Sequence, residues 1–95
     1  MEELKEDNLG DLLSQNEKVM VQYGAGWCGN CRIMKPKFKK FAAENPGTSF
    51  YYVDAEKYPG SRKYADVSNL PTFAAFSKGE LMKQIQTNKM DCLLY

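Results

Sequence analysis

The stretch Trp27-Cys28-Gly29-Asn30-Cys31 places two thiols three positions apart. The segments on either side can hold these two thiols in a fixed position. A cysteine is nucleophilic as the thiolate, so a reactive cysteine needs surroundings that favour the anion. The first turn of a helix offers such surroundings, because its backbone N–H groups are unpaired and point outward. Two cysteines at this spacing can also close a ring disulfide. The stretch therefore predicts a redox-active pair at the start of a helix.

The flanking segments predict a strand–turn–helix junction around the pair. Residues 18–23 are rich in apolar and β-branched side chains and predict a buried strand that ends at the turn Gly24-Ala25-Gly26. Helical periodicity over 28–44 places one apolar stripe on Cys31, Met34, Phe38, Phe41 and Ala42. Cys31 thus falls on the core stripe, whereas we expect Cys28 to stay accessible. An accessible attacking sulfur and a shielded resolving sulfur suit reversible disulfide exchange.

The other segments complete an α/β pattern. The sequence predicts an edge strand over 2–5, a helix over 9–15 capped by Asn8, a strand over 48–54, a short helix over 61–65 capped by Ser61, strands over 72–76 and 80–86, and a last helix after Asn88. Pro36 predicts a kink in the long helix. We expect a mixed sheet with a parallel first half, an antiparallel hairpin at its edge and helices on its faces. At this length the pattern indicates one domain over 1–95.

Composition and charge narrow the function classes. The chain has 95 residues, a net charge of +1, three cysteines and no histidine. We expect no nucleic-acid or membrane partner from this charge, and no disulfide scaffold from an odd, small number of cysteines. A zinc site is disfavoured because it needs about four ligands. The acidic start over 1–7 is not typical of a secretory signal, so we expect a reducing, cytoplasmic setting.

The residues resemble the thioredoxin family across nearly the whole chain. The features that carry the resemblance are Trp27-Cys28-Gly29-Asn30-Cys31, Pro36 in the helix, Val53-Asp54 after the strand, Leu70-Pro71-Thr72, and Phe76-Ser77-Lys78-Gly79-Glu80. A lone C-x-x-C is weak, but this combination is specific. The resemblance implies a thioredoxin fold and a small thiol–disulfide oxidoreductase that reduces protein disulfides.

The resemblance also implies residue roles. Cys28 attacks a substrate disulfide and Cys31 resolves the mixed disulfide. Pro71 follows a cis peptide bond next to the pair, and Leu70 offers its backbone to an extended substrate. Trp27 shields the site and gives partners an apolar surface, with Gly29 and Asn30 completing the turn. No cofactor is bound, and reducing equivalents come from NADPH through a thioredoxin reductase.

Several positions depart from the family pattern. A buried Asp usual in the family is Gln22 here, and the Lys that pairs with it is Tyr52, so both charges of that pair are lost. Asn30 replaces the usual Pro between the cysteines, which predicts a less reducing potential. We expect a monomer, although the apolar end over 92–95 suggests docking or exchange between chains.

Alternative interpretations remain open at this point. The chain could be a redox-silent thioredoxin-like binding module, although it retains the cysteine pair. An oxidase or isomerase of protein folding would usually carry a His between the cysteines and an export signal. Gln22 and Tyr52 could be only structural polar residues of the core. The basic residues on the long helix could be a solvated face, with Arg32 and Lys35 steering acidic partners.

Overall fold

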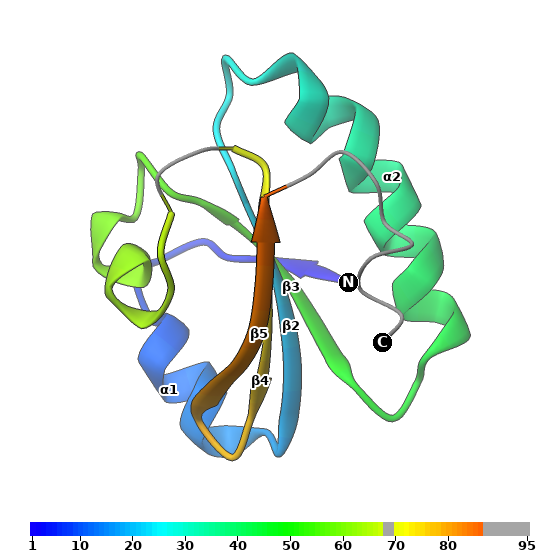
Figure 1. Ribbon diagram of the computed structural model, residues 1–95, viewed down its shortest axis with the longest axis vertical. Coiled ribbons are helices and arrows are strands. Elements are labelled where there is room, and N and C mark those ends of the chain that lie inside the picture. The colour runs from blue at the N-terminus through cyan, green and yellow to red at the C-terminus, as the bar shows by residue number, and fades with distance from the viewer. Residues whose placement is uncertain (68–69, 87–95) are drawn as a thin grey trace.

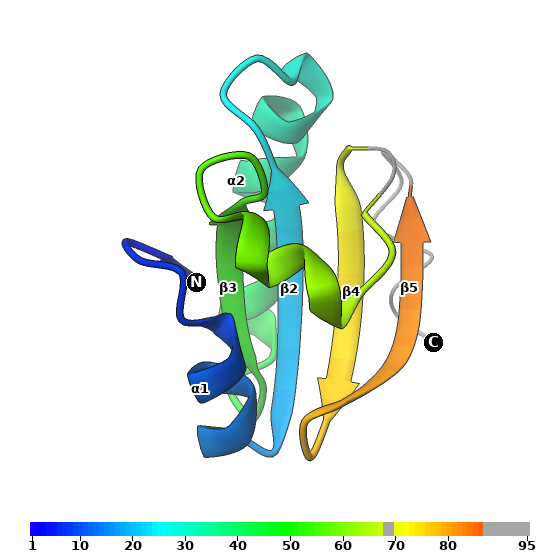
Figure 2. The ribbon, with the colours of Figure 1, turned by 90° about the vertical axis from the view of Figure 1, so that its left-hand side faces the viewer.

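The computed structural model describes residues 1–67 and 70–86, which build a five-stranded mixed sheet between helices. The elements are β1 (Glu2–Glu3), α1 (Leu9–Gln15), β2 (Lys18–Gly24), α2 (Gly29–Glu44), β3 (Ser49–Asp54), the 3₁₀ helix η1 (Pro59–Tyr64), β4 (Thr72–Ser77) and β5 (Glu80–Gln86). Figure 1 shows α2 on one face of the sheet and α1 on the other. Figure 2 shows η1 on the same face as α1. The expected layered α/β fold is confirmed.

The strand order is β1-β3-β2-β4-β5, and it separates two kinds of pairing. β1 and β2 both pair with β3 in parallel, whereas β4 pairs antiparallel with β2 and β5. A parallel first half and an antiparallel hairpin edge were both predicted from the sequence. β2 lies at the centre of the sheet, so the cysteine pair that follows it starts from a strand held on both sides.

Alternation along β2 divides the core into two clusters. Val19, Val21 and Tyr23 face α1 and η1, where they pack with residues such as Leu9 and Leu13. On the opposite face, Met20 packs with the residues that α2 and the neighbouring strands contribute: Met34, Phe38, Phe50 and Phe73. Because successive side chains of a strand point to opposite faces, Gln22 lies on the α2 face, below the cysteine pair.

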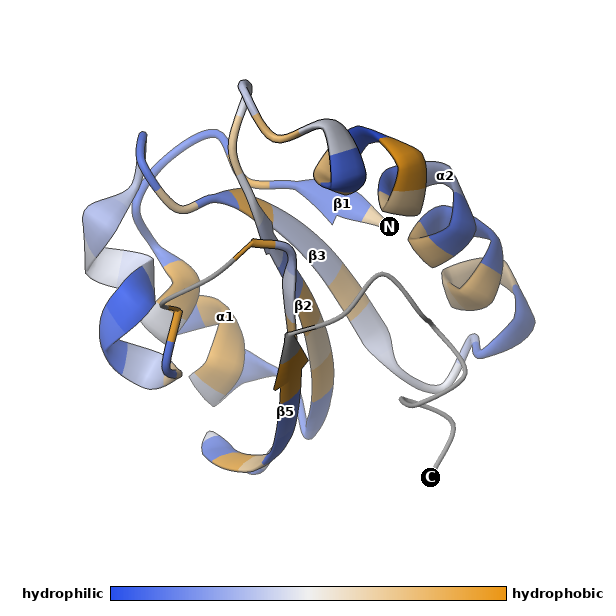
Figure 3. Cartoon of the chain, turned by 45° about the horizontal axis from the view of Figure 1, so that its top comes forward, coloured by the Kyte–Doolittle hydropathy of each residue, from blue (hydrophilic) through white to orange (hydrophobic). Residues whose placement is uncertain are grey.

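The amphipathic pattern of α2 holds the helix against the sheet. Cys31, Met34 and Phe38 are buried, as their spacing predicted, and Figure 3 shows hydrophilic and apolar residues alternating along the helix. Phe38 lies 5.2 Å from Phe50 and 5.5 Å from Phe73 between ring centroids. The helix continues through Pro36 from Gly29 to Glu44. This anchor fixes the end of α2 that carries the cysteines.

Some local predictions were wrong. The segment predicted as a short helix over 61–65 is the 3₁₀ helix η1, which begins at Pro59; Ser61 lies inside it, and its hydroxyl donates to the Tyr58 carbonyl. Asn8 occupies the N-cap position of α1 as predicted, but its side chain makes no capping hydrogen bond, and its Nδ2 donates to Glu6 Oε1. The first strand covers two residues rather than four. The predicted last helix after Asn88 lies outside the described residues.

Candidate active site

The cysteine pair lies where β2 ends and α2 begins, and its two sulfurs form a disulfide. The Cα atoms of Cys28 and Cys31 are 5.2 Å apart, within the usual range for a disulfide. Cys28 is the N-cap of α2, and its sulfur accepts a hydrogen bond from the Cys31 backbone N–H at 3.2 Å. The backbone N–H of Cys28 donates to the Ala25 carbonyl at 3.1 Å. The pair is therefore held in the predicted place, at the amide end of a helix.

The expectation of an accessible Cys28 was wrong for this disulfide form. Cys28 is 4% exposed and Cys31 is 0% exposed, so the disulfide lies beneath the surface. Both cysteines pack with Ala25, and Leu70 covers them from the neighbouring loop. In this form the Cys28 sulfur is bonded to the sulfur of the fully buried Cys31.

Trp27 presents an exposed apolar surface next to Cys28. Its side chain is 70% exposed, and its indole N–H donates to the carboxylate of Glu56 in the loop after β3. Ile33, on the first turns of α2, is 59% exposed. The predicted apolar contact surface is therefore present next to Cys28, and shielding of the site by Trp27 stays a prediction. The role of Glu56 was missed, because only the folded loop brings it to the indole.

Arg32 holds the turn that carries the cysteines. Its guanidinium donates from Nη2 to the Gly26 carbonyl at 2.6 Å, just before Trp27 and Cys28. The sequence suggested only a solvated face or steering of partners for this residue. Because the Arg32 side chain is exposed, this hydrogen bond contributes little to the stability of the fold. It does place a positive charge next to the turn.

The remaining predicted turn residues lie around the pair. The peptide bond between Leu70 and Pro71 is cis, as the resemblance implied. Leu70 is half-buried against the cysteines and Pro71 is buried. Gly29 and Asn30 are exposed in the first turn of α2. The β4 entry loop and the α2 turn thus meet at the disulfide.

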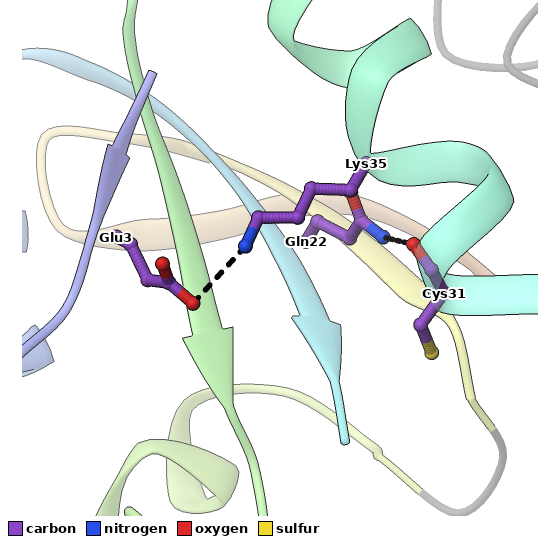
Figure 4. A network of polar contacts seen from close by, with 4 residues as sticks. All are labelled: Glu3, Gln22, Cys31 and Lys35. Atoms are coloured by element: carbon purple, nitrogen blue, oxygen red, sulfur yellow. Dashed lines mark hydrogen bonds and ion pairs between the residues drawn. The ribbon is translucent and has the colours of Figure 1, made fainter. Parts of the chain in front are cut away.

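Gln22 and Tyr52 are neighbours on adjacent strands, below the first turns of α2. They are register partners in the β2–β3 pairing. Gln22 is 0% exposed, and its Nε2 donates to the backbone carbonyl of Cys31 at 3.1 Å. Figure 4 shows this amide reaching from β2 to the turn of α2 that carries Cys31. Gln22 thus touches the second cysteine directly, which the sequence could not decide.

Lys35 of α2 places a positive charge beside Tyr52, the position at which the sequence had lost the family's Lys. The ammonium of Lys35 lies 4.4 Å from the centre of the Tyr52 ring and pairs with a Glu3 carboxylate oxygen at 3.1 Å. Figure 4 shows the Lys35 side chain crossing toward β1. Burial, then the charges of Asp54 and Glu3, raise the pKa of the Tyr52 hydroxyl, and Arg32 opposes them. Tyr52 is therefore neutral at pH 7.

The described residues, 1–67 and 70–86, hold neither a cluster of metal-ligating side chains nor a membrane-spanning helix. Within them, no group of three or more His, Cys, Asp or Glu side chains is placed to hold a metal ion. None of the helices in the same ranges has the length and apolar character needed to cross a bilayer. Cys92, the third cysteine, lies outside the described residues.

Comparisons with known proteins agree with this geometry. The sequence profile of the family described as Thioredoxin matches residues 1–94. The chain is 35% identical over 72 residues to thioredoxin of Mycoplasma pneumoniae, covering 76% of this chain and 71% of that protein. It is 32% identical over 75 residues to mitochondrial thioredoxin-3 of Saccharomyces cerevisiae, covering 79% of this chain and 59% of that protein.

Solved structures extend the likeness to the whole fold. The crystal structure of oxidised mitochondrial thioredoxin 3 from Saccharomyces cerevisiae superimposes with a TM-score of 0.88 at 27% identity. That alignment covers 99% of this chain and 90% of the yeast chain. The overall fold of this chain is therefore shared with an oxidised thioredoxin of known structure.

Proposed function

This chain belongs to the thioredoxin family, and from that premise we propose that it reduces disulfides of other proteins through Cys28 and Cys31. Thiol–disulfide oxidoreductase chemistry is what the family and the paired cysteines support together. The observation that carries the proposal is the disulfide at the amide end of α2, with an exposed apolar surface beside it.

In the proposed cycle the reduced pair gives two electrons to a client disulfide. The Cys28 thiolate attacks one client sulfur, forms a mixed disulfide and displaces the other client sulfur as a thiolate, which takes up a proton. The Cys31 thiol loses its proton and attacks the Cys28 sulfur. The second client sulfur then leaves as a thiolate and is protonated in turn. The products are a client dithiol and the Cys28–Cys31 disulfide seen here.

The helix start supplies part of the ionisation that this cycle needs. Lowering a thiol pKa from about 8.5 to near 7, the value typical of thioredoxins, takes roughly 2 kcal/mol. A helix N-terminus typically contributes about 0.3–1 kcal/mol. The Cys31 N–H that already donates to the Cys28 sulfur is the group placed to contribute further.

The partners follow from the proposed chemistry. A thioredoxin reductase carrying electrons from NADPH would regenerate the dithiol, and disulfide-containing proteins would be the clients. No bound cofactor is required for exchange between sulfurs. A chain with few cysteines suits a reducing compartment such as the cytoplasm, where we propose that it works as a monomer.

Reduction of insulin disulfides by the protein with dithiothreitol tests the proposal. The wild-type chain should accelerate insulin precipitation over dithiothreitol alone, and Cys28→Ser should abolish the acceleration. Cys31→Ser should instead accumulate a mixed disulfide, detectable by mass. A wild-type chain that leaves insulin untouched would mark a redox-silent binding module and remove the proposed function.

A further inference from the structure

The exposed side of α2 carries positive charges that no carboxylate neutralises within residues 1–67 and 70–86. Of the five cations on this helix, the half-buried Lys35 pairs with Glu3. The other four are exposed and form no ion pair in the same residue ranges: Arg32, Lys37, Lys39 and Lys40. Arg32 donates to a backbone carbonyl, which leaves its charge uncompensated. We call these four side chains the basic face of α2.

The basic face makes the charge of the molecule uneven. α2 carries five Lys or Arg residues and one Glu, a net charge of +4. The whole chain has a net charge of +1, so the residues outside α2 have a net charge of −3. Figure 1 shows α2 running along one face of the sheet. A partner that approaches this helix therefore meets a positive surface on an otherwise acidic molecule.

The placement of the cations does not stabilise the helix. α2 has Arg32 in its first turn and no basic residue in its last turn, which is the reverse of what the helix dipole favours. Lys35 and Lys39 are four residues apart, a spacing at which like charges destabilise a helix by about 0.2–0.5 kcal/mol. A solvated face would explain why the cations are exposed, but not why they gather on one helix. An interaction with another molecule explains both.

The basic face begins at the redox pair. Arg32 directly follows Cys31, and Ile33 is 59% exposed. Lys37 lies four residues after Ile33, on the same side of the helix. At a rise of about 1.5 Å per residue, Arg32 and Lys40 are about 12 Å apart along the helix axis. About four residues of an extended peptide span this distance.

We propose that the basic face of α2 binds an acidic segment beside the disulfide of a client protein, with Asp or Glu within about four residues of the client cysteine. This inference rests on the proposed function, because it names the clients of the same cysteine pair. Opposite charges steer the client to the pair, so they raise the rate of association more than the affinity. Nucleic acid and anionic lipid also attract cations, but the exposed Trp27 and Ile33 next to the cysteines suit a polypeptide.

The test compares two disulfide peptides that differ only in about four residues beside one cysteine, which are Glu in one peptide and Gln in the other. The second-order rate constant for reduction by the reduced protein is measured for each. It is divided by the rate constant with dithiothreitol, an uncharged reductant, to remove differences in intrinsic reactivity. At an ionic strength of about 0.1 M, the wild type should reduce the Glu peptide about tenfold faster, the low end for electrostatic steering. At about 1 M the Debye length is about 3 Å, so the two rates should become equal.

Two double variants separate the basic face from the total charge. Lys37→Glu with Lys40→Glu brings the net charge of α2 from +4 to zero, so the preference for the Glu peptide should disappear. Lys18→Glu with Lys78→Glu changes the total charge equally, from exposed positions at the end of the sheet opposite the cysteine turn. At about 0.1 M the Debye length is about 10 Å, so this control should keep the tenfold preference.

Each outcome decides the inference. Equal rates for the two peptides in the wild type overturn it, and so does an equal loss of preference in both double variants. The preference is a ratio within one variant, so a partly inactive variant still reports it. If Lys37→Glu with Lys40→Glu does not fold, Lys37→Gln with Lys40→Gln replaces it and should lower the preference.

Other occupants of the basic face give other results. A DNA oligonucleotide that binds through Lys37 and Lys40, while both peptides are reduced equally fast, would assign the face to nucleic acid and contradict the inference. Phosphatidylserine vesicles that bind through the same lysines, again with equal peptide rates, would contradict it in favour of a membrane. A wild type that reduces neither peptide removes the proposed function, and this inference with it.

Discussion

At the residue scale, position 22 limits how readily Cys31 can attack. Gln22 cannot accept a proton at neutral pH, and Cys31 must lose one to resolve a mixed disulfide. We expect Gln22→Asp to speed resolution by up to about 10²-fold near neutrality, the low end for a positioned general base. The measurement is single-turnover release of a chromogenic thiol from a preformed mixed disulfide with Cys28.

Gln22→Asn is the matched control for that change, because it has the length of Asp without its charge. Asn should resolve no faster than the wild-type Gln. If Asp and Asn behave alike, side-chain length and not a base at position 22 governs the rate. Unchanged kinetics in Gln22→Asp would show that water or the departing thiolate already takes the proton without limiting the step.

Asn30 sets a second residue-scale expectation, for the redox potential. Unlike a Pro between the cysteines, Asn30 keeps a backbone N–H in the first turn of α2, where such groups are unpaired and can stabilise a Cys28 thiolate. We therefore expect a potential above about −270 mV, the value for thioredoxin. Asn30→Pro should lower it. A wild-type potential at or below about −270 mV in a glutathione titration contradicts this.

Some features of the site could be predicted from the sequence, and others could not. The spacing of Cys28 and Cys31 and the hydrophobic period that follows them were enough to predict the pair and its place. The contacts of Arg32 with Gly26 and of Glu56 with Trp27 were not foreseen. Long or exposed side chains find partners across loops, and no local pattern encodes which loop will lie in reach.

At the element scale, the packing of α2 against the sheet holds the two sulfurs in place. Phe38 is fully buried between Phe50 and Phe73, two turns after Cys31. Phe38→Ala should lower the free energy of unfolding by about 3–5 kcal/mol, since it removes a fully buried ring and leaves a cavity. Urea unfolding of the oxidised protein measures the loss.

Phe41→Ala is the control on the same helix. Phe41 is partly buried and meets Phe50 at 5.5 Å between ring centroids, so it has less apolar contact to lose. Its cost should fall clearly below that of Phe38→Ala. Equal costs would mean that the C-terminal half of α2 is anchored more broadly than the core around Phe38 indicates.

Element types were easier to predict than element ends. The strands over 18–24 and 72–77 match their predicted ranges within a residue, because apolar runs and turn residues bound them. A short helix was predicted around Ser61, but its start was not, because Ser61 lies inside η1 and does not cap it. A Ser hydroxyl can cap a helix or bond back to a nearby carbonyl, and here it donates to the Tyr58 carbonyl three residues earlier.

At the scale of the whole molecule, the strand order explains why the segment around the two cysteines predicts so much of the site. β2 is central and pairs with β3 and β4, so its end is fixed from both sides. The cysteine turn follows β2 directly, and the Leu70–Pro71 loop enters the neighbouring β4. Two segments about forty residues apart therefore meet at the disulfide because their strands are adjacent.

The same central strand makes the stability of the molecule sensitive to alkaline pH. Tyr23 of β2 is fully buried, and its hydroxyl donates to the Ser61 carbonyl of η1 at 3.0 Å. Burial, and secondarily Tyr64, raise the pKa of Tyr23 in the folded protein. Unfolding exposes a hydroxyl that ionises near pH 10. The stability from this group is therefore complete below about pH 10 and falls as the pH rises toward the folded-state pKa.

Tyr23→Phe should reveal this contribution in the free energy of unfolding. Near neutrality the variant loses one buried hydrogen bond, so it should be less stable by about 0.5–1.5 kcal/mol. Above about pH 10 the wild type loses stability through Tyr23 and the variant does not, so the difference should shrink. Denaturant unfolding of the wild type and the variant, at pH 7 and at increasing alkaline pH, measures both the stability difference and its decrease. A stability difference that stays constant or grows with pH would show that the pKa of Tyr23 is no higher in the folded protein than in the unfolded chain.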